Sequence, residues 1–464
     1  MAARASLAEQ PLYPPRVTPP PKPLSLPKFV VRFISNPLLA VPEPVYHEPL
    51  FSYKARRSRI CWITAPDLVK DVLLDRRETF PKTELEQRVL GPMLGKGILT
   101  SEGAEWRWQR QLAAPLFRHG EILRYVPTMV GAAQHLVEEW RSQGPGARRH
   151  IDKDMTRATF EVIANTLLTG GESAVGRIIE EKANDYLGSI SWSIAYALLS
   201  LPTWLPFPGR SRMHRAERDL RAAVAEQIRA RRAAPEAADD LFARLMTARH
   251  PETGEPMSET QLVDNLLTFF TAGHETTAKA LTWTLYLLAR SPEWAARIRE
   301  EVRAVAGDGP VSEAHIERLV VVGQVIKESM RLYPPAPVLT RVAAEDTRLA
   351  DVTIAAGTLI VMPIYAIHRH RRLWADPDRF DPTRFAPERE ATYSRYQFMP
   401  FGAGPRICIG SAFALIEATA MLATLVRETH FEVAAGHLPM PVSRVTLRPK
   451  GGMPMRVTVA AGAG

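Results

Sequence analysis

A single cysteine in a glycine-rich loop is the residue of this chain best placed to do chemistry. Residues 401–410 read FGAGPRICIG and contain Cys408. Glycine permits backbone conformations and close approaches that a side chain would block, so a flat, bulky group could lie against this loop. A helical pattern begins at Ser411, and the N-terminus of a helix favours a thiolate. Cys408 is therefore a candidate metal ligand, although a cysteine on its own is more often buried and inert.

The spacing around Cys408 resembles the haem-binding signature of the cytochrome P450 family. Phe401 lies seven residues before the cysteine, Arg406 two before it and Gly410 two after it. In that family the cysteine thiolate is the proximal ligand of haem iron, and its electron donation favours O–O cleavage. The resemblance implies that Cys408 binds iron, that Phe401 and Gly402 lie beside the haem, and that Arg406 donates to a haem propionate.

A second candidate site is a long helical pattern at 264–288, which contains the sequence AGHETT. Glycine costs about 1 kcal/mol relative to alanine in a helix interior. The hydroxyl residues beside it can bond back to carbonyls four residues earlier, so such a helix tends to bend. The stretch resembles the family's oxygen-binding helix. That resemblance implies room for dioxygen at Ala272 and Gly273 and a proton-conducting pair at Glu275 and Thr276, whereas an ordinary helix interior is the alternative.

Other residues are candidates to hold the carboxylates of the haem. Trp106 and Arg110 are four residues apart in a predicted helix at 103–117, so they share one helix face. This spacing resembles the family's propionate-binding helix, although tryptophan and arginine pair on many protein surfaces. Arg341, ten residues beyond Arg331, matches an arginine that many family members direct at the second propionate.

A predicted helix at 319–332 carries Glu328 and Arg331, three residues apart on one face. The pair resembles the family's Glu-x-x-Arg motif, which locks to a later arginine, here Arg384. The resemblance implies a buried structural cluster, whereas the spacing alone could occur on any surface helix. Breaking such a buried pair typically costs about 3–5 kcal/mol.

The resemblance also places a set of uncharged residues over the haem. These are Leu266, Phe269, Phe270, Val338 and Leu339, together with Pro337. A carboxylate beside such side chains would lack a partner, so we expect neutral or mostly apolar substrates, with a fatty acid as second choice. By position, the apolar segment 191–208 resembles the family's mobile lid, and ordinary packing is the equal alternative.

Composition is that of a globular protein. The chain has 464 residues, of which 46% are hydrophobic and 23% charged, and no internal linker is evident. Residues 1–28 hold eight prolines and no unbroken apolar run, which predicts a soluble, proline-rich arm without a transmembrane anchor. Residues 29–464 are predicted to form a single haem domain.

Charge and cysteine content limit the partners. A net charge of +9 is compatible with nucleic acid, anionic membrane or an acidic protein. No nucleic-acid motif is present, and most arginines lie beside acids, as in the helical stretch 211–232, where the charges are expected to be solvated. With Cys61 and Cys408 as the two cysteines, no disulfide framework is indicated, Cys61 is expected in the core, and a cytoplasmic location fits.

The expected fold is mainly α with a small β region, the cytochrome P450 fold, with haem b (iron protoporphyrin IX) between the oxygen-binding helix and the cysteine loop. A strand is predicted at 59–64, a helix at 67–74, a hairpin at 348–362 around Ala356 and Gly357, and further strands after residue 430. No flavin fingerprint, glycine-rich phosphate loop or iron–sulfur cysteine set is present. We therefore expect electrons from a separate ferredoxin or flavoprotein reductase, with NAD(P)H used only indirectly.

The resemblance implies a haem-thiolate monooxygenase. Dioxygen would be activated reductively, protons would pass through Glu275 and Thr276, and one oxygen atom would enter a C–H or C=C bond of a hydrophobic substrate. One alternative is a peroxide-using or rearranging haem-thiolate enzyme, against which the acid–threonine pair argues. Another is a haem-thiolate sensor or carrier without turnover, and the residual alternative is a globular protein without haem.

Overall fold

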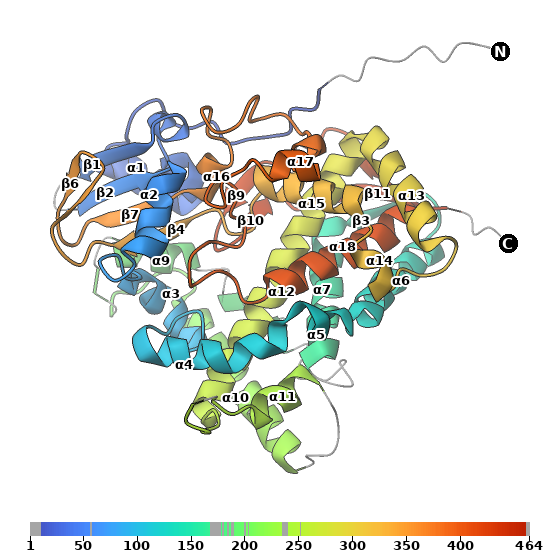
Figure 1. The fold of residues 1–464 in the computed structure, drawn as a ribbon, viewed down its shortest axis with the longest axis horizontal. Helices are drawn as coiled ribbons and strands as arrows, with labels where there is room; N and C mark the ends of the chain where they lie inside the picture. Colours follow the sequence, from blue (N-terminus) through green and yellow to red (C-terminus); the bar gives the residue numbers. More distant parts are fainter. Residues whose placement is uncertain are drawn as a thin grey trace.

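The computed structural model describes residues 11–55, 58–167, 178, 181–182, 185–186, 190–198, 201–202, 204–233, 240–250 and 252–460. Helices dominate, and the larger sheet lies to one side of them (Figure 1). The helices are α1 (Leu26–Ser35), α2 (Pro66–Lys70), α3 (Glu84–Leu94), α4 (Gly103–Ala113), α5 (His119–Leu123), α6 (Val126–Ser142), α7 (Ile151–Leu167), α9 (Ile190–Leu198), α10 (Arg210–Ala233), α11 (Leu241–Thr247), α12 (Glu259–Arg290), α13 (Pro292–Ala306), α14 (Glu313–Ile316), α15 (Val320–Leu332), α16 (Ile364–Ile367), α17 (Pro387–Glu390) and α18 (Ser411–Glu428).

Within the part of the chain that the structure describes, the strands form four small sheets. The largest has the order β1-β2-β7-β4, in which β2 and β7 are parallel and the other neighbours antiparallel. A three-stranded sheet has the order β3-β11-β8, and β5-β6 and β9-β10 are two-stranded. The strands are β1 (Leu50–Ala55), β2 (Ser58–Ile63), β3 (Ala147–His150), β4 (Leu339–Val342), β5 (Thr347–Leu349), β6 (Val352–Ile354), β7 (Leu359–Met362), β8 (Thr429–Val433), β9 (Pro441–Ser443), β10 (Leu447–Pro449) and β11 (Pro454–Val459). The prediction of a mainly α fold with a small β region is therefore confirmed.

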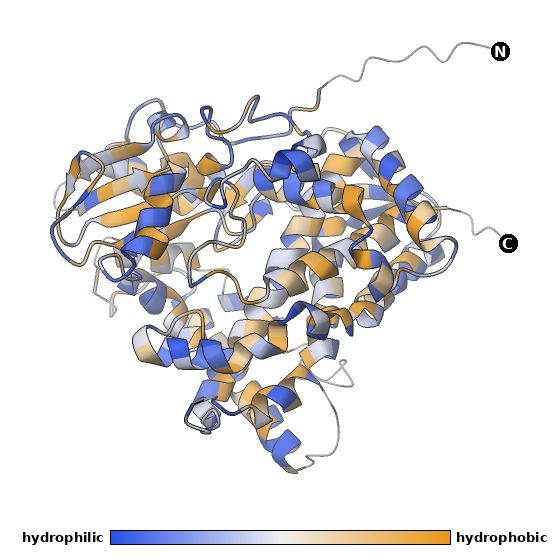
Figure 2. Ribbon diagram, in the orientation of Figure 1, coloured by the Kyte–Doolittle hydropathy of each residue, from blue (hydrophilic) through white to orange (hydrophobic). Residues whose placement is uncertain are grey.

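Helix α12 crosses the middle of the molecule (Figure 1). It starts at a capping box, in which the Ser258 hydroxyl accepts from the Gln261 N–H and the Gln261 side chain accepts from the Ser258 N–H. Most of its side chains are buried, since it packs against α7, α10, α15 and α18. Figure 2 shows hydrophobic residues concentrated on the inner helices and on the strands, whereas the surface helix α17 is hydrophilic. No helix among the described residues has the length and apolar character that a membrane span requires.

The N-terminal arm packs along the body of the protein. Val17 is buried, and its N–H donates to the Tyr365 hydroxyl at 3.2 Å. The carbonyl of Pro15 accepts from the Tyr333 hydroxyl at 2.7 Å. Helix α1 begins at Leu26, so the predicted domain boundary at residue 28 falls in its first turn. The division into an arm and one haem domain stays a prediction.

Several predicted elements are confirmed, and one is wrong. The strand at 59–64 is β2, where Cys61 is fully buried, and the helix at 67–74 is α2 continued by a π-helical turn. The predicted hairpin is misplaced, because its turn lies at Ala350, which has φ of 47°. Gly357 instead connects β6 to β7, and β7 pairs with β2 and β4 in the larger sheet. Alternation alone did not show which strand each run would pair with.

Helix α10 departs from the predicted row of solvated charges. Arg221 forms an ion pair with the buried carboxylate of Asp264 at 2.8 Å. Arg231, which is buried itself, pairs with Asp240 at 2.8 Å. Segment 191–208, expected to be a lid, lies partly outside the described residues. Its described part includes Tyr196, whose ring packs against Phe207 at 5.3 Å, and the lid stays a prediction.

Candidate active site

The cysteine loop is held by its own backbone. The N–H of Cys408 donates to the carbonyl of Phe401 at 2.9 Å, and that of Ile407 donates to Gly404 at 3.1 Å. The loop ends directly before α18, whose first residue is Ser411. The backbone thus presents the Cys408 side chain just before the N-terminus of a helix, as the sequence predicts.

Two glycines in this loop have a left-handed backbone, with φ of 72° at both Gly402 and Gly404. A side chain at Gly404 would also collide with the backbone, since its Cβ would lie 2.4 Å from the Leu73 carbonyl oxygen. At Gly402 a Cβ would lie 3.6 Å from Leu339 Cδ1. At Gly404, the space that a side chain would need is therefore occupied by the backbone of Leu73.

The Cys408 residue is exposed to solvent, although the protein atoms around its thiol desolvate it. Its side chain is exposed, whereas desolvation raises the pKa of the thiol, and the Gly410 N–H and Arg110 oppose that rise. The loop alone therefore does not stabilise a thiolate, whereas a bound metal cation would. Among the described residues, no three His, Cys, Asp or Glu side chains gather as a metal site. An iron bound by Cys408 would thus need further ligands from a cofactor such as haem.

Arginines approach the cysteine loop from α4 and from the loop itself. Arg110 Nη1 donates to the carbonyl of Ile407 at 2.7 Å, one residue before the cysteine. The guanidinium of Arg406 lies 4.3 Å from the centre of the Trp106 ring and donates to the Ser101 carbonyl at 3.0 Å. The structure therefore brings the predicted Trp106, Arg110 and Arg406 together beside Cys408.

Arg341 extends this cationic cluster, and so does Lys82, which no sequence signal indicated. Desolvation lowers the pKa of both side chains, and the charges of Arg341 and Arg406 lower that of Lys82 further. The Lys82 ammonium donates to Glu86 Oε2 at 2.5 Å, and Glu86 and Glu102 oppose the lowered pKa of Arg341. Lys82, Arg341 and Arg406 are all partly desolvated, and such cations suit a cofactor that carries carboxylates. In the sequence, Lys82 and Glu86 read as an ordinary i,i+4 surface pair.

One face of α12 is accessible in the middle of the protein. Ala272 is exposed and Thr276 partly so, whereas the neighbouring His274 and Glu275 are buried. Ala272 and Thr276 are four residues apart and share this face. The Thr276 hydroxyl donates to the Ala272 carbonyl at 2.8 Å, which is the predicted back-bond. The donor set of thiol, cations and hydroxyl fits a haem bounded by α12 and the cysteine loop.

Glu275 is held by the C-terminal hairpin. Its carboxylate accepts from the Thr446 hydroxyl at 2.9 Å and forms an ion pair with Arg448. Burial alone would raise the pKa of Glu275, but Arg448, Lys279 and Thr446 lower it below its ordinary value. Glu275 is therefore ionised in this arrangement. Among the described contacts, it makes no hydrogen bond to the neighbouring Thr276, although the sequence pairs the two.

Two residues of α12 that were predicted to lie near the haem, Phe270 and Gly273, are on the face that packs against α7. Phe270 packs against Phe160 of α7 at 6.4 Å, and a Cβ on Gly273 would lie 3.1 Å from Ile163 of the same helix. These contacts do not support a pocket role for Phe270 or room for dioxygen at Gly273, because that face packs on α7.

The other predicted pocket residues differ in their access to solvent. Leu266 is fully buried, and Phe269 packs against Phe117 at 5.3 Å. Val338 is 43% exposed, and Leu339 lies against Gly402. The pocket-lining role of this set stays a prediction.

Glu328, Arg331 and Arg384 meet in a buried cluster. Arg331 donates to both Glu328 oxygens, at 2.6 and 2.8 Å, and Arg384 Nε lies 3.6 Å from Glu328 Oε1. Glu328 and Arg331 are completely buried. Arg331 also donates to the carbonyl of His368 at 2.7 Å, and His368 Nε2 accepts from the Met399 N–H at 3.0 Å. This chain of bonds connects the cluster to Met399, two residues before the cysteine loop, and no sequence signal indicated His368.

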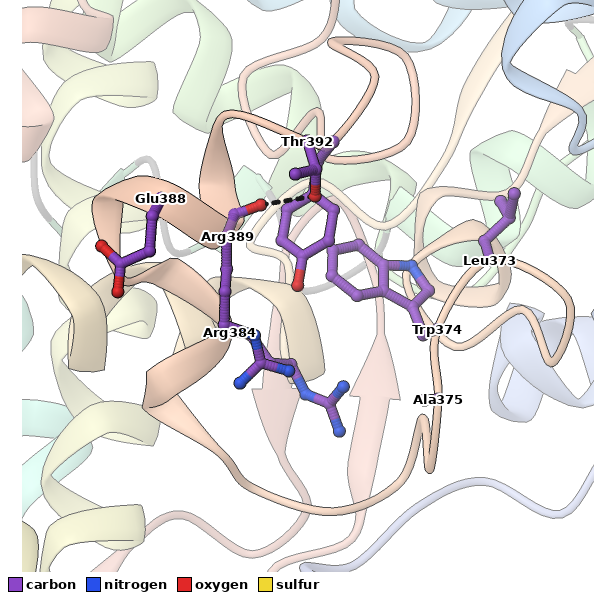
Figure 3. A pocket seen from close by; sticks show the side chains of 8 residues that line it. Leu373, Trp374, Ala375, Arg384, Glu388, Arg389 and Thr392 are labelled. Carbon is purple, nitrogen blue, oxygen red and sulfur yellow. Dashed lines mark hydrogen bonds between the residues drawn. The ribbon is translucent and has the colours of Figure 1, made fainter.

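A cavity of about 350 Å³ lies beside this cluster (Figure 3). It is lined by Leu373, Trp374, Ala375, Arg384, Glu388, Arg389, Thr392 and Tyr393. None of these residues belongs to the cysteine loop or to α12. The cavity is thus separate from the candidate active site.

Comparisons with known proteins agree with this geometry. The cytochrome P450 family model matches residues 34–455. The chain is 34% identical over 408 residues to a cytokinin hydroxylase of Arabidopsis thaliana, covering 85% of this chain and 78% of the relative. It is 33% identical to cyclooctat-9-en-7-ol 5-monooxygenase of Streptomyces melanosporofaciens, covering 82% of each chain.

A solved structure is similar over nearly the whole length. The crystal structure of the cytochrome P450DA heme domain superposes with a TM-score of 0.82 at 25% identity and covers 96% of this chain and 98% of that chain. The family match, the relatives and the fold lead to the same conclusion. The chain belongs to the cytochrome P450 family.

Proposed function

We propose that this P450 monooxygenase acts on a hydrophobic organic substrate with electrons from a separate protein. The observation that carries the proposal is the accessible Cys408 thiol before α18, close to the Arg110 guanidinium, together with the neighbouring cations Arg406, Arg341 and Lys82 that extend from the same loop. Haem, when bound, would supply the iron centre at which dioxygen is activated. Cys408 would hold the haem iron through its sulfur, and the cations Lys82, Arg341 and Arg406 would bind its carboxylates.

The chain's own residues would then control protons. The Thr276 hydroxyl lies on the accessible face of α12 and can hold a proton donor toward the cofactor. Glu275 is the nearest acid in sequence, and it would have to exchange its contacts with Arg448 and Thr446 before it could recharge Thr276. This requirement makes the hairpin β9–β10 part of the proton supply.

Apolar substrates are supported by the uncharged candidates Phe269, Val338 and Leu339 and by the relatives. The names of two relatives, cyclooctat-9-en-7-ol 5-monooxygenase and 11-oxo-beta-amyrin 30-oxidase of Glycyrrhiza uralensis, designate mostly hydrocarbon compounds. A carboxylate among such side chains would be desolvated without a partner. Titrating ferric protein with a long alkanol and a short dicarboxylate tests this, and tighter binding of the dicarboxylate would contradict it.

The electron source is proposed to be a ferredoxin or a flavoprotein reductase in the cytoplasm, which itself oxidises NAD(P)H. The sequence contains no flavin or iron–sulfur motif of its own. The protein should be inactive with NAD(P)H alone and active with a reductase system. Activity that hydrogen peroxide supports and a reductase system does not would indicate the peroxide-using alternative.

The assignment of Cys408 has a direct test with a matched control. Reduced protein treated with carbon monoxide should show the far-red-shifted Soret band of a thiolate complex, and Cys408→Ser should abolish it. Cys61→Ala should keep the band, because Cys61 is completely buried in β2. A band that survives in Cys408→Ser would show that this assignment is wrong.

A further inference from the structure

Helix α18 carries a buried carboxyl group, that of Glu417. Glu417 is 1% exposed, and neither of its carboxyl oxygens has a hydrogen-bond partner of ordinary geometry among the described residues. A buried polar group without partners is rare in folded proteins and calls for an explanation. Glu417 lies nine residues beyond Cys408, and the role proposed above for this P450 does not use it.

The state of this carboxyl follows from its surroundings. Burial raises the pKa of Glu417 to about 8, and the Thr277 hydroxyl opposes the rise. No charged side chain among the described residues contributes to this shift. A carboxyl group in such a site is neutral at pH 7, so it carries a hydroxyl that can donate a hydrogen bond.

The neighbouring threonine lies at a sensitive place in α12. Thr277 is buried, and its hydroxyl donates to the Gly273 carbonyl at 3.4 Å, a long hydrogen bond. Its neighbour Thr276 bonds back to Ala272 in the same way at 2.8 Å. Helices α12 and α18 pack against each other, and Thr277 lies beside Glu417. The same turn of α12 carries the accessible residues Ala272 and Thr276.

We propose that Glu417 is a neutral carboxylic acid that donates a hydrogen bond to Thr277 and thereby positions the turn of α12 that carries Ala272 and Thr276. In this arrangement the Glu417 hydroxyl donates to Thr277, and the Thr277 hydroxyl remains directed at the Gly273 carbonyl. An ionised Glu417 could only accept, so it would draw the Thr277 hydroxyl away from Gly273. The effect on Thr276 rests on the function proposed above, whereas the protonation of Glu417 does not.

Infrared difference spectroscopy tests the protonation without turnover. At neutral pH, wild type minus Glu417→Gln should contain the C=O stretch of a protonated carboxyl, and this band should shift in deuterated water. Thr277→Val should move the band to higher frequency because the carboxyl loses its acceptor. Thr282→Val is the control, since Thr282 also bonds back along α12, to Ala278 at 2.6 Å.

The outcomes of that measurement decide the proposal. A carboxylate signal in place of the C=O band at neutral pH would overturn it, as would a band that Thr277→Val leaves unmoved. If Glu417→Gln does not fold, the Thr277→Val shift of the carboxyl band decides the question on its own.

Coupling, the yield of product per electron pair, tests the positioning role. Glu417→Leu and Thr277→Val should each lower coupling by about fivefold, the ratio for one hydrogen bond of ordinary net strength. The double variant should be no worse than either alone, because both remove the same bond. Glu417→Gln should retain coupling, since its amide can still donate to Thr277.

These readouts separate the two proposals. If wild type gives no product with any reductase but shows the carboxyl band, the proposed function fails and the protonated Glu417 stands. If Glu417→Leu couples like wild type, the positioning role is refuted while the monooxygenase remains.

Discussion

Replacing Glu328 by glutamine should destabilise the protein strongly. The Glu328 carboxylate is completely buried and balances two guanidinium groups, those of Arg331 and Arg384. Its Oε1 atom also accepts from the Asp381 N–H at 2.8 Å. Glu328→Gln keeps the shape of the side chain but leaves two buried cations without their counter-charge.

The expected magnitude follows from this geometry. Stranding a buried charge by removing its partner costs about 3–5 kcal/mol. An entropy of unfolding of about 2.1 cal/mol/K per residue amounts to about 1 kcal/mol/K for 464 residues. The Tm should therefore fall by about 3–5 °C, and the urea midpoint should fall with it.

Glu390→Gln is a matched control for this experiment. Glu390 accepts from the Lys327 ammonium through both oxygens, at 2.8 and 2.6 Å, but both side chains are about one-third exposed. Surface pairs contribute about 0–1 kcal/mol, so this variant should unfold almost like wild type. The reasoning is refuted if Glu328→Gln lowers the free energy of unfolding by no more than Glu390→Gln does.

Four further outcomes are expected. Thr276→Ala should lower product per electron pair and raise hydrogen peroxide, whereas Glu275→Gln should slow the whole cycle because it removes the acid that recharges the relay. Burial, reinforced by the nearby arginines, lowers the pKa of His368 to about 3, so unfolding takes up a proton below about pH 6.5. Stability should then fall by up to about 1.4 kcal/mol per pH unit as pH drops from 6.5 toward 3, and His368→Gln should flatten this slope in urea titrations. Turnover at limiting partner should fall as salt rises past about 0.1 M if exposed Arg107 and Arg118 help to dock an acidic protein, and replacing both by glutamine should flatten that response.

The part of the site that could be predicted lies within short stretches of sequence. The cysteine loop spans residues 401–410, and the Glu328–Arg331 pair spans residues 328–331. Because each stretch is short, its residue spacing alone carries a signal. The contact of Arg384 with this pair is predicted from the family motif and not from any local pattern. The structure brings Glu328, Arg331 and Arg384 together and places Arg110 on the cysteine loop, whereas the roles of the loop residues toward haem stay predictions.

The remaining residues depend on contacts between distant segments. Glu275 meets Thr446 and Arg448 about 170 positions later, and hydropathy patterns contain no information on such a pairing. Lys82 resembles a surface residue until the fold buries it beside Arg341. For the same reason, the sequence does not show which face of α12 packs on α7. The family resemblance therefore predicts Phe270 in the pocket, whereas its ring packs against Phe160 of α7.

The packed N-terminal arm has a consequence for the timing of synthesis. The segment that holds Val17 leaves the ribosome well before Tyr365, to which it bonds and which follows 348 residues later. At about 5–20 residues per second, the arm must wait roughly 20 to 70 seconds before its binding surface exists. Its prolines favour an extended, solvated conformation that does not compete with the final contact. A segment that is synthesised early is thus among the last to dock, and a chain released before Tyr365 is made would carry it unattached.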